Sequence, residues 1–265
     1  MRRVGTSGPV FYQFEQWPGD DGLAHGIFTR LGGVSQAPWQ SLNVGSTVGD
    51  EPQAVLTNKA RQYEALGVDG SRVFTVWQVH GARTRVVNAP LADPDDLDAL
   101  EQADGLVTDR PGLTLTMRFA DCVPVLFYDP TRQVIGMAHA GWRGTVRGAA
   151  PSVVRTMVET FGCRPQDIQA GIGPSIGPEH YQVGAEVVAA FREAFADGDR
   201  FFHRAAEGTF FLNLWEANRQ ALAAVGVTQV EIAALCTASH TDEFYSHRAE
   251  QGRTGRFGAL MTLRA

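Results

Sequence analysis

The sequence predicts a mixed α/β or α+β protein in which helices cover mixed β-sheets. Two observations predict this class. Strand-length apolar segments bounded by Gly, Pro and Asp concentrate in the first 140 residues, and helices alternate with strands after that point. The chain of 265 residues is long enough to bury a large core, and it contains no internal repeat and no Gly/Ser/Pro-rich linker. We therefore expect a single domain over residues 1–265.

The predicted strands are short apolar runs that end at turn-forming residues. In chain order they are residues 23–28, 72–77, 84–89, 113–119, 123–128, 134–140, 230–235 and 258–263.

Helical spacing of apolar residues predicts helices over 52–66, 145–161, 184–196 and 213–225. Pro151 disfavours a helix in the first half of 145–161. The acidic stretch 93–104 is expected to form a solvated, capped helix rather than a cation site, because it lacks the alternating spacing and the glycine of a calcium loop.

Composition excludes several classes of protein. A formal net charge of −6 argues against sequence-independent nucleic-acid binding, which needs a basic face. The longest apolar runs are strand-length, and acidic residues and proline follow the N-terminal arginines, so neither a membrane span nor a signal peptide is expected. Three widely spaced cysteines, an odd number, fit a reducing compartment. We expect a soluble, cytoplasmic protein.

Three side chains at the edges of apolar strands are candidate metal ligands: His80, Cys122 and His139. Two imidazoles and one thiolate leave one tetrahedral position free, as catalytic zinc requires. Their wide spacing matches no zinc-finger pattern. Two other interpretations stay open from the residues alone: ordinary buried or hydrogen-bonded side chains, or a nucleophilic Cys122 with His139 as its base and Asp121 or another carboxylate orienting the imidazole.

Arginines in loops that also contain glycine are candidate anion ligands, because a planar guanidinium binds phosphate or carboxylate through two hydrogen bonds. Arg143 stands out among them, since it lies four residues after His139 and just before a predicted helix N-terminus. A surface or salt-bridge role is the alternative for each. The set comprises Arg30, Arg143, Arg147, Arg248, Arg253 and Arg256.

Seven motifs are spread along almost the whole chain: TRLGGVSQAPWQSLNVG (29–45), QVHG (78–81), ADGLVTDRPG (103–112), ADCVPVLFYDP (120–130), HAGWRG (139–144), GIGPSIGPEHYQVG (171–184) and FYSHRAEQGRTGR (244–256). Together they resemble the YfiH-type family, long labelled polyphenol oxidase or laccase-domain proteins and now described as purine nucleoside phosphorylases. The resemblance implies an αββα-layered fold and a metal, usually zinc, at the positions of His80, Cys122 and His139.

The resemblance also implies an activity: phosphorolysis of adenosine, inosine and 5′-methylthioadenosine to the free base and a ribose 1-phosphate, together with deamination of adenosine. Purine nucleosides and inorganic phosphate are then the expected partners. Two alternatives come from the same family: a cysteine-dependent amidohydrolase acting on a muropeptide precursor, and a copper-dependent polyphenol oxidase. The oxidase is disfavoured by counting, because a multicopper enzyme needs roughly eight imidazoles beyond its His-His-Cys centre, and the chain has 7 His.

The implied reactions suggest roles for individual residues. A bound metal would activate water for deamination or act as an electrophile at the purine, and Arg143 with other loop arginines would bind phosphate. Asn43 is a candidate substrate contact, with turn stabilisation as the alternative. Asp121 is the candidate acid or base.

Overall fold

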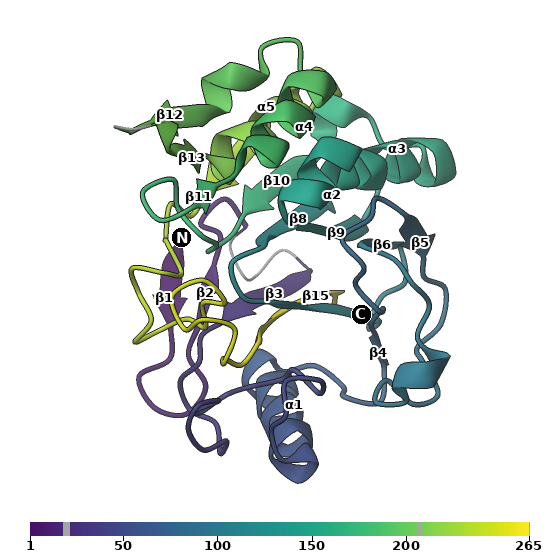
Figure 1. The fold of residues 1–265 in the computed structure, drawn as a ribbon. Coiled ribbons are helices and arrows are strands. Elements are labelled where there is room, and N and C mark those ends of the chain that lie inside the picture. The colour runs from purple at the N-terminus through teal and green to yellow at the C-terminus, as the bar shows by residue number, and fades with distance from the viewer. Residues whose placement is uncertain (18–21, 206–207, 265) are drawn as a thin grey trace.

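The molecule consists of two six-stranded sheets stacked between helices (Figure 1). The structure is a computed structural model that describes residues 1–17, 22–205 and 208–264. Helices α2 (Trp142–Arg147), α3 (Ala149–Phe161) and α5 (Leu214–Ala224) cover the outer face of one sheet, and α4 (Ala185–Ala194) packs on α2. Helix α1 (Pro52–Leu66) packs on the outer face of the other sheet. The predicted α+β class with mixed sheets covered by helices is therefore confirmed, with its layers in the order helix, sheet, sheet, helix.

The first sheet is antiparallel except at one edge, where β4 and β7 run parallel. The last strand of the chain, β15, is central and fully buried, so it brings the loop that precedes it back to the middle of the molecule. In spatial order the strands are β1 (Arg2–Val4), β2 (Phe11–Gln13), β3 (Leu23–Phe28), β15 (Phe257–Leu263), β7 (Thr114–Phe119) and β4 (Val73–Phe74).

The second sheet is built around the hairpin of β8 and β9, whose residues are all buried. Side chains of β8 alternate between two cores: Val125 and Phe127 face the helices, while Leu126 and Tyr128 face the first sheet. Burial on both faces explains why VPVLFY is apolar throughout. In spatial order the strands are β14 (Gln229–Ile232), β10 (Gln169–Ile172), β8 (Val123–Asp129), β9 (Val134–Ala140), β6 (Gly105–Thr108) and β5 (Thr84–Val86).

The helix predicted over 145–161 is two helices, which corrects the sequence prediction. The chain breaks at Gly148, whose φ of 77° ends the first helix in the left-handed region that favours glycine. Pro151 lies in the first turn of the second helix, where a missing N–H costs nothing. The helices are α1 (Pro52–Leu66), α2 (Trp142–Arg147), α3 (Ala149–Phe161), α4 (Ala185–Ala194) and α5 (Leu214–Ala224).

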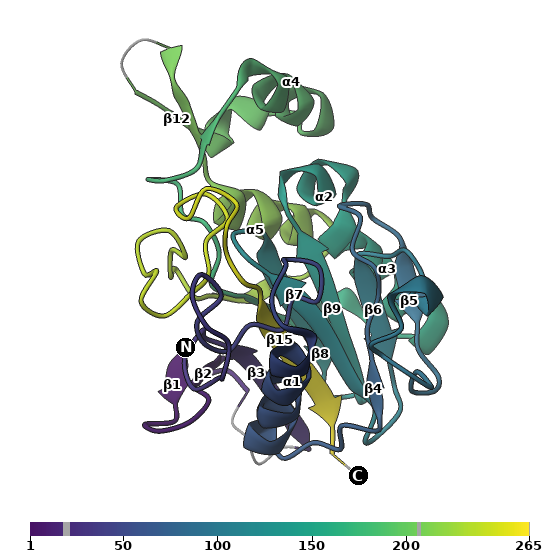
Figure 2. The same ribbon diagram turned by 60° about the horizontal axis from the view of Figure 1, so that its bottom comes forward.

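Several predicted elements are shorter than expected, namely the strands at 72–77, 84–89 and 230–235. The acidic helix is a single 3-10 turn, η1 (Leu97–Ala99), capped by the carboxylate of Asp96. No helix in the described ranges is long and apolar enough to cross a bilayer. Figure 2 shows a small third sheet projecting beside α4. Its strands are β11 (Gln182–Val183), β13 (Phe210–Leu212) and β12 (Phe202–Arg204). Two further 3-10 turns are η3 (Gly198–Phe201), which directly precedes β12, and η2 (Pro165–Asp167), which precedes β10.

Candidate metal centre and its cavity

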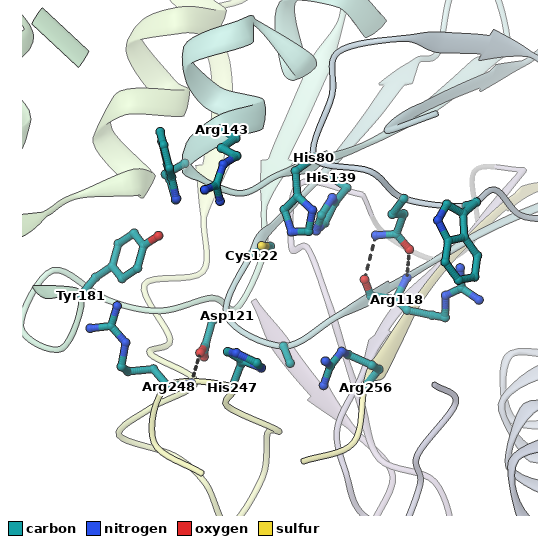
Figure 3. A pocket seen from close by; sticks show the side chains of 14 residues that line it. His80, Arg118, Asp121, Cys122, His139, Arg143, Tyr181, His247, Arg248 and Arg256 are labelled. Atoms are coloured by element: carbon teal, nitrogen blue, oxygen red, sulfur yellow. Dashed lines mark hydrogen bonds between the residues drawn. The ribbon is translucent and has the colours of Figure 1, made fainter. Parts of the chain in front are cut away.

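Strand pairing brings the three candidate metal ligands to one place. The ligand atoms of His80, Cys122 and His139 all lie within 4.8 Å of one another (Figure 3). Cys122 immediately precedes β8, and His139 is the second-last residue of β9, opposite Pro124 in the register of the hairpin. His80 arrives from the loop between β4 and β5, and its ring centroid is 4.8 Å from that of His139. These three residues could hold a metal ion.

A buried carboxylate that the sequence did not single out, Asp104, orients His139. Its Oδ1 lies 2.8 Å from Nδ1 of His139, and its main-chain carbonyl accepts the His139 N–H at 2.8 Å. With Nδ1 directed at Asp104, Nε2 is the nitrogen left for a metal. The only sequence signal for Asp104 was its place in the ADGLVTD motif, one residue before β6.

Asp104 also holds the turn that carries His80. Its two oxygens accept the main-chain N–H groups of His80 and Gly81 at 3.0 and 2.7 Å, and that of Val79 at 3.2 Å. His80 has a φ of 58°, an uncommon conformation for a residue with a side chain. Arg147 supports the same turn from outside by donating to the His80 carbonyl at 2.8 Å. One carboxylate thus fixes two of the three ligands.

The charges of the three ligands support one another. Burial raises the pKa of Cys122, but the adjacent His139 and His80 imidazoles outweigh this effect and lower the pKa to about 6. Burial lowers the pKa of His139, and Cys122 and Asp104 raise it instead to about 9. The cluster therefore favours the thiolate, which is the form of cysteine that binds metals.

Gly141 leaves room for two of the three ligands. A Cβ atom on Gly141 would lie 2.6 Å from the Cys122 sulfur and 3.4 Å from Cδ2 of His80, so a larger residue would crowd both ligands. Two imidazoles, a thiolate and an orienting carboxylate suit a borderline-soft divalent ion such as zinc. The donor set therefore fits a metal.

The cluster opens onto a cavity of about 440 Å³ with an unusual charge balance. Among the described residues that line it, one is a carboxylate, Asp121, whereas four are arginines. None of the four forms an ion pair with a carboxylate in the described ranges. These arginines are Arg118, Arg143, Arg248 and Arg256, of which Arg118 was not singled out from the sequence.

Asp121 and Arg143, two candidates from the sequence, both reach this cavity. Arg143 is exposed at the rim, with its guanidinium 4.3 Å from the centre of the Trp142 ring. Asp121 is buried with a φ of 80°, and its two oxygens accept hydrogen bonds from the Thr237 hydroxyl at 2.7 Å and the Arg248 main-chain N–H at 2.6 Å. Asp121 therefore also ties the loop before β15 to the start of β8.

Asn43 does not line the cavity. Its side chain is fully buried, where Oδ1 accepts the N–H groups of Gly45 and Arg256 at 2.9 and 2.8 Å and Nδ2 donates to Asp50 at 2.8 Å. The geometry favours the turn-stabilising alternative over a direct substrate contact.

A family model described as "Multi-copper polyphenol oxidoreductase laccase" matches residues 24–264. The donor set does not fit the copper chemistry in that description. The chain has 7 His, of which only His80, His139 and His247 line the cavity, whereas a three-copper cluster needs many imidazoles within one site. His25, for example, is buried beside the Trp17 ring.

Relatives with other names cover nearly the whole chain. "Purine nucleoside phosphorylase" of Deinococcus radiodurans is 39% identical over 241 residues, covering 91% of this chain and 89% of its own. "Purine nucleoside phosphorylase YlmD" of Bacillus subtilis is 36% identical over 244 residues, with 90% and 88% covered. The crystal structure of the Bacillus licheniformis hypothetical protein YfiH superposes with a TM-score of 0.91 at 37% identity, with 98% and 97% covered. This chain therefore belongs to the YfiH/YlmD-type purine nucleoside phosphorylase family.

Proposed function

We propose that this protein cleaves purine nucleosides with inorganic phosphate at a zinc site formed by His80, Cys122 and His139. The substrates would be adenosine, inosine and 5′-methylthioadenosine, and the products the free base and ribose 1-phosphate or its methylthio analogue. Deamination of adenosine would be a second activity. The observation that carries the proposal is a metal-type donor set opening onto a cavity with four arginines and one carboxylate. The names of the relatives support it.

Phosphorolysis requires a bound anion near the ribose and an electrophile at the purine, and the residues that line this cavity, with a bound metal, could provide both. A phosphate oxygen bonds to C1′ of the ribose as the bond from C1′ to the purine nitrogen breaks, and the electron pair and a proton end on the purine. The ribose carbon is cationic on the way, so an anion must be held close to it. When bound, zinc would supply an electrophile for the purine and, for deamination, would lower the pKa of water.

The chain's own residues would bind the substrates and move the proton. Arg143 at the rim is proposed to contact the substrate. Asp121 is proposed as the acid or base: an ionised carboxylate has lone pairs beyond the two hydrogen bonds that it already accepts, so it would accept a proton and could then donate it. Asp104 would keep His139 in the tautomer with a free Nε2. Three free cysteines support a cytoplasmic location.

Product identification tests the proposal. Zinc-loaded protein incubated with adenosine should release adenine only when phosphate is present, and inosine in both tubes would demonstrate deamination. In Cys122→Ala, zinc content and adenine release should fall together to background, because a thiolate ligand is lost. Full phosphorolysis by a variant without zinc would contradict the metal site.

A cysteine-dependent amidohydrolase acting on a muropeptide precursor is the second candidate. The observation that favours it is the chain of contacts from Cys122 through His139 to Asp104, with the pKa of Cys122 lowered to about 6 by the two imidazoles against the effect of burial. Metal-free protein would then be fully active and form a trapped acyl-thioester on Cys122, and prior alkylation would abolish activity. If removal of the metal abolished amidase activity, this mechanism would be excluded.

A further inference from the structure

One arginine in the cavity has the surroundings of a binding residue rather than a structural one. Arg256 is half-buried directly before β15 and forms no ion pair within the described ranges. Only its Nη1 makes described hydrogen bonds, to the carbonyls of Gly255 at 2.8 Å and Thr254 at 3.2 Å. We propose that Arg256 is the main contact of inorganic phosphate, which rests on the phosphorolysis proposed above.

A buried arginine elsewhere, Arg30, shows what a structural arginine looks like in this protein. Arg30 pairs with Glu250 at 3.0 Å and donates to the carbonyls of Gln40 and Thr241, each at 2.8 Å. Its charge is therefore balanced inside the protein. The charge of Arg256 has no such partner, and a partly buried cation without a counter-ion is costly. A bound anion would supply the missing partner.

The loop that contains Asn43 is shaped around Arg256. Asn43 accepts the Arg256 main-chain N–H at 2.8 Å, and the Arg256 carbonyl accepts the Val44 N–H at 3.0 Å. A Cβ atom on Gly45 would lie 2.7 Å from Cγ of Arg256, so only glycine leaves room for this side chain. Asn43 is thus a positioning residue for Arg256.

The position of Arg256 suits the phosphate of the reaction. Figure 3 shows Arg143 above Cys122, beside the two imidazoles, and Arg256 and His247 below Cys122, so the two arginines lie in different parts of the cavity lining. Arg256 lines the same cavity as Cys122 and Asp121. Burial lowers the pKa of Arg256, and the negative charges of Cys122 and Asp121 offset this in part. Phosphate at Arg256 would leave the rim near Arg143 free for the nucleoside.

The inference can be tested with Arg256→Gln and a matched control from the same loop. In Arg256→Gln, the KM for phosphate in inosine phosphorolysis should rise about 10- to 100-fold, and the KM for inosine should change less than about threefold, because charge-assisted hydrogen bonds to the anion are lost. Arg253→Gln removes an exposed arginine outside the cavity lining and should leave both values within about twofold.

Two further variants separate binding from folding. Arg256→Lys keeps the charge but not the planar fork, so its KM for phosphate should lie between those of the wild type and Arg256→Gln. Asn43→Ala keeps every charge in the cavity but frees the main chain of Arg256. It should raise the KM for phosphate by about three- to tenfold with kcat little changed. An unchanged phosphate KM in both Arg256 variants would overturn the proposal.

A calorimetric titration of zinc-loaded protein with inorganic phosphate distinguishes failure of this proposal from failure of the proposed function. Phosphate binding by the wild type and Arg253→Gln but not by Arg256→Gln would support the phosphate site, even if no nucleoside were cleaved. Equal binding by Arg256→Gln, together with normal cleavage, would overturn the site while leaving phosphorolysis standing. A wild type that binds no phosphate and releases no base when phosphate is present would overturn both.

Discussion

The two sides of the cavity are built in different ways. The side that carries His80, Cys122 and His139 depends on strand register: Cys122 and His139 flank the paired ends of β8 and β9, and a buried carboxylate locks the imidazoles. The arginine side uses long side chains from β7, from loops and from the start of α2, held by main-chain carbonyls and aromatic rings.

This difference follows from what each ligand requires. A metal needs its donor atoms at distances fixed within a few tenths of an ångström, which a buried sheet supplies. An oxyanion accepts hydrogen bonds over a wider range of geometry but needs cations that no internal carboxylate neutralises. We therefore expect substitutions to have their largest effects where rigid, buried partners hold the metal ligands.

Asp104→Asn should have the largest effect among the residues that position the ligands. The amide cannot accept from all of the N–H groups that face Asp104, so His139 and the His80 turn both lose their orientation. We expect zinc affinity to fall about 10- to 100-fold, measured by competition with a chelator.

Asp109→Asn is the matched control for this variant. Asp109 directly follows β6, at the opposite end of the strand from Asp104, and its side chain is 40% exposed. Its zinc affinity should equal that of the wild type. Thermal unfolding of the metal-free variants would separate a loss of metal binding from a loss of fold. Unchanged zinc affinity in a folded Asp104→Asn protein would show that strand register alone fixes the ligands.

The central hairpin and its two ligands could be predicted from the sequence, because apolar runs with a Cys or His at their edge have a direct structural meaning. The partner of His139 could not. The sequence left this role to Asp121 or another carboxylate. The side chain of Asp121, whose backbone is left-handed, instead contacts Thr237 and the Arg248 main chain. Asp104 reaches His139 from the position directly before β6, the strand that pairs with β9.

For the arginine side, the sequence predicted only which loops contain candidate arginines, not which partners these arginines have. The sequence marks six arginines in segments that also contain glycine, but it does not say that Arg30 is paired with Glu250 while Arg256 is not. The role of Asn43 was equally hidden, because its partner Arg256 is far away in the chain. Pairing at such sequence separation depends on the return of β15 to the centre of the first sheet.

The reactivity of Cys122 should change less than the zinc affinity of Asp104→Asn, and it tests how the metal side is stabilised electrostatically. Its lowered pKa means that the thiolate predominates above about pH 6, so iodoacetamide modification of metal-free protein should rise through pH 6 and level off near neutrality. At pH 7 the thiolate fraction would be about 90%, against about 3% for an ordinary cysteine. Peptide mass spectrometry would locate the label.

Cys163 is an internal control in the same experiment. Burial, with a hydrogen bond to Asp129, raises its pKa to about 12, so Cys163 should stay unmodified in the folded protein. Zinc should protect Cys122. A modification rate that rises only above pH 8 would show that the imidazoles do not stabilise the thiolate, and the metal side would lose its electrostatic support.

Arg147→Ala should have the smallest effect, although Arg147 holds the same turn as Asp104. Its hydrogen bond to the His80 carbonyl is exposed, so water can replace it, and the loss is expected to be below about 1 kcal/mol. Zinc affinity should therefore fall less than about fivefold in the same chelator competition. A loss as large as that of Asp104→Asn would mean that the His80 turn is held from the solvent side. The metal side would then depend on a loop contact, as the arginine side does, and the distinction between them would fail.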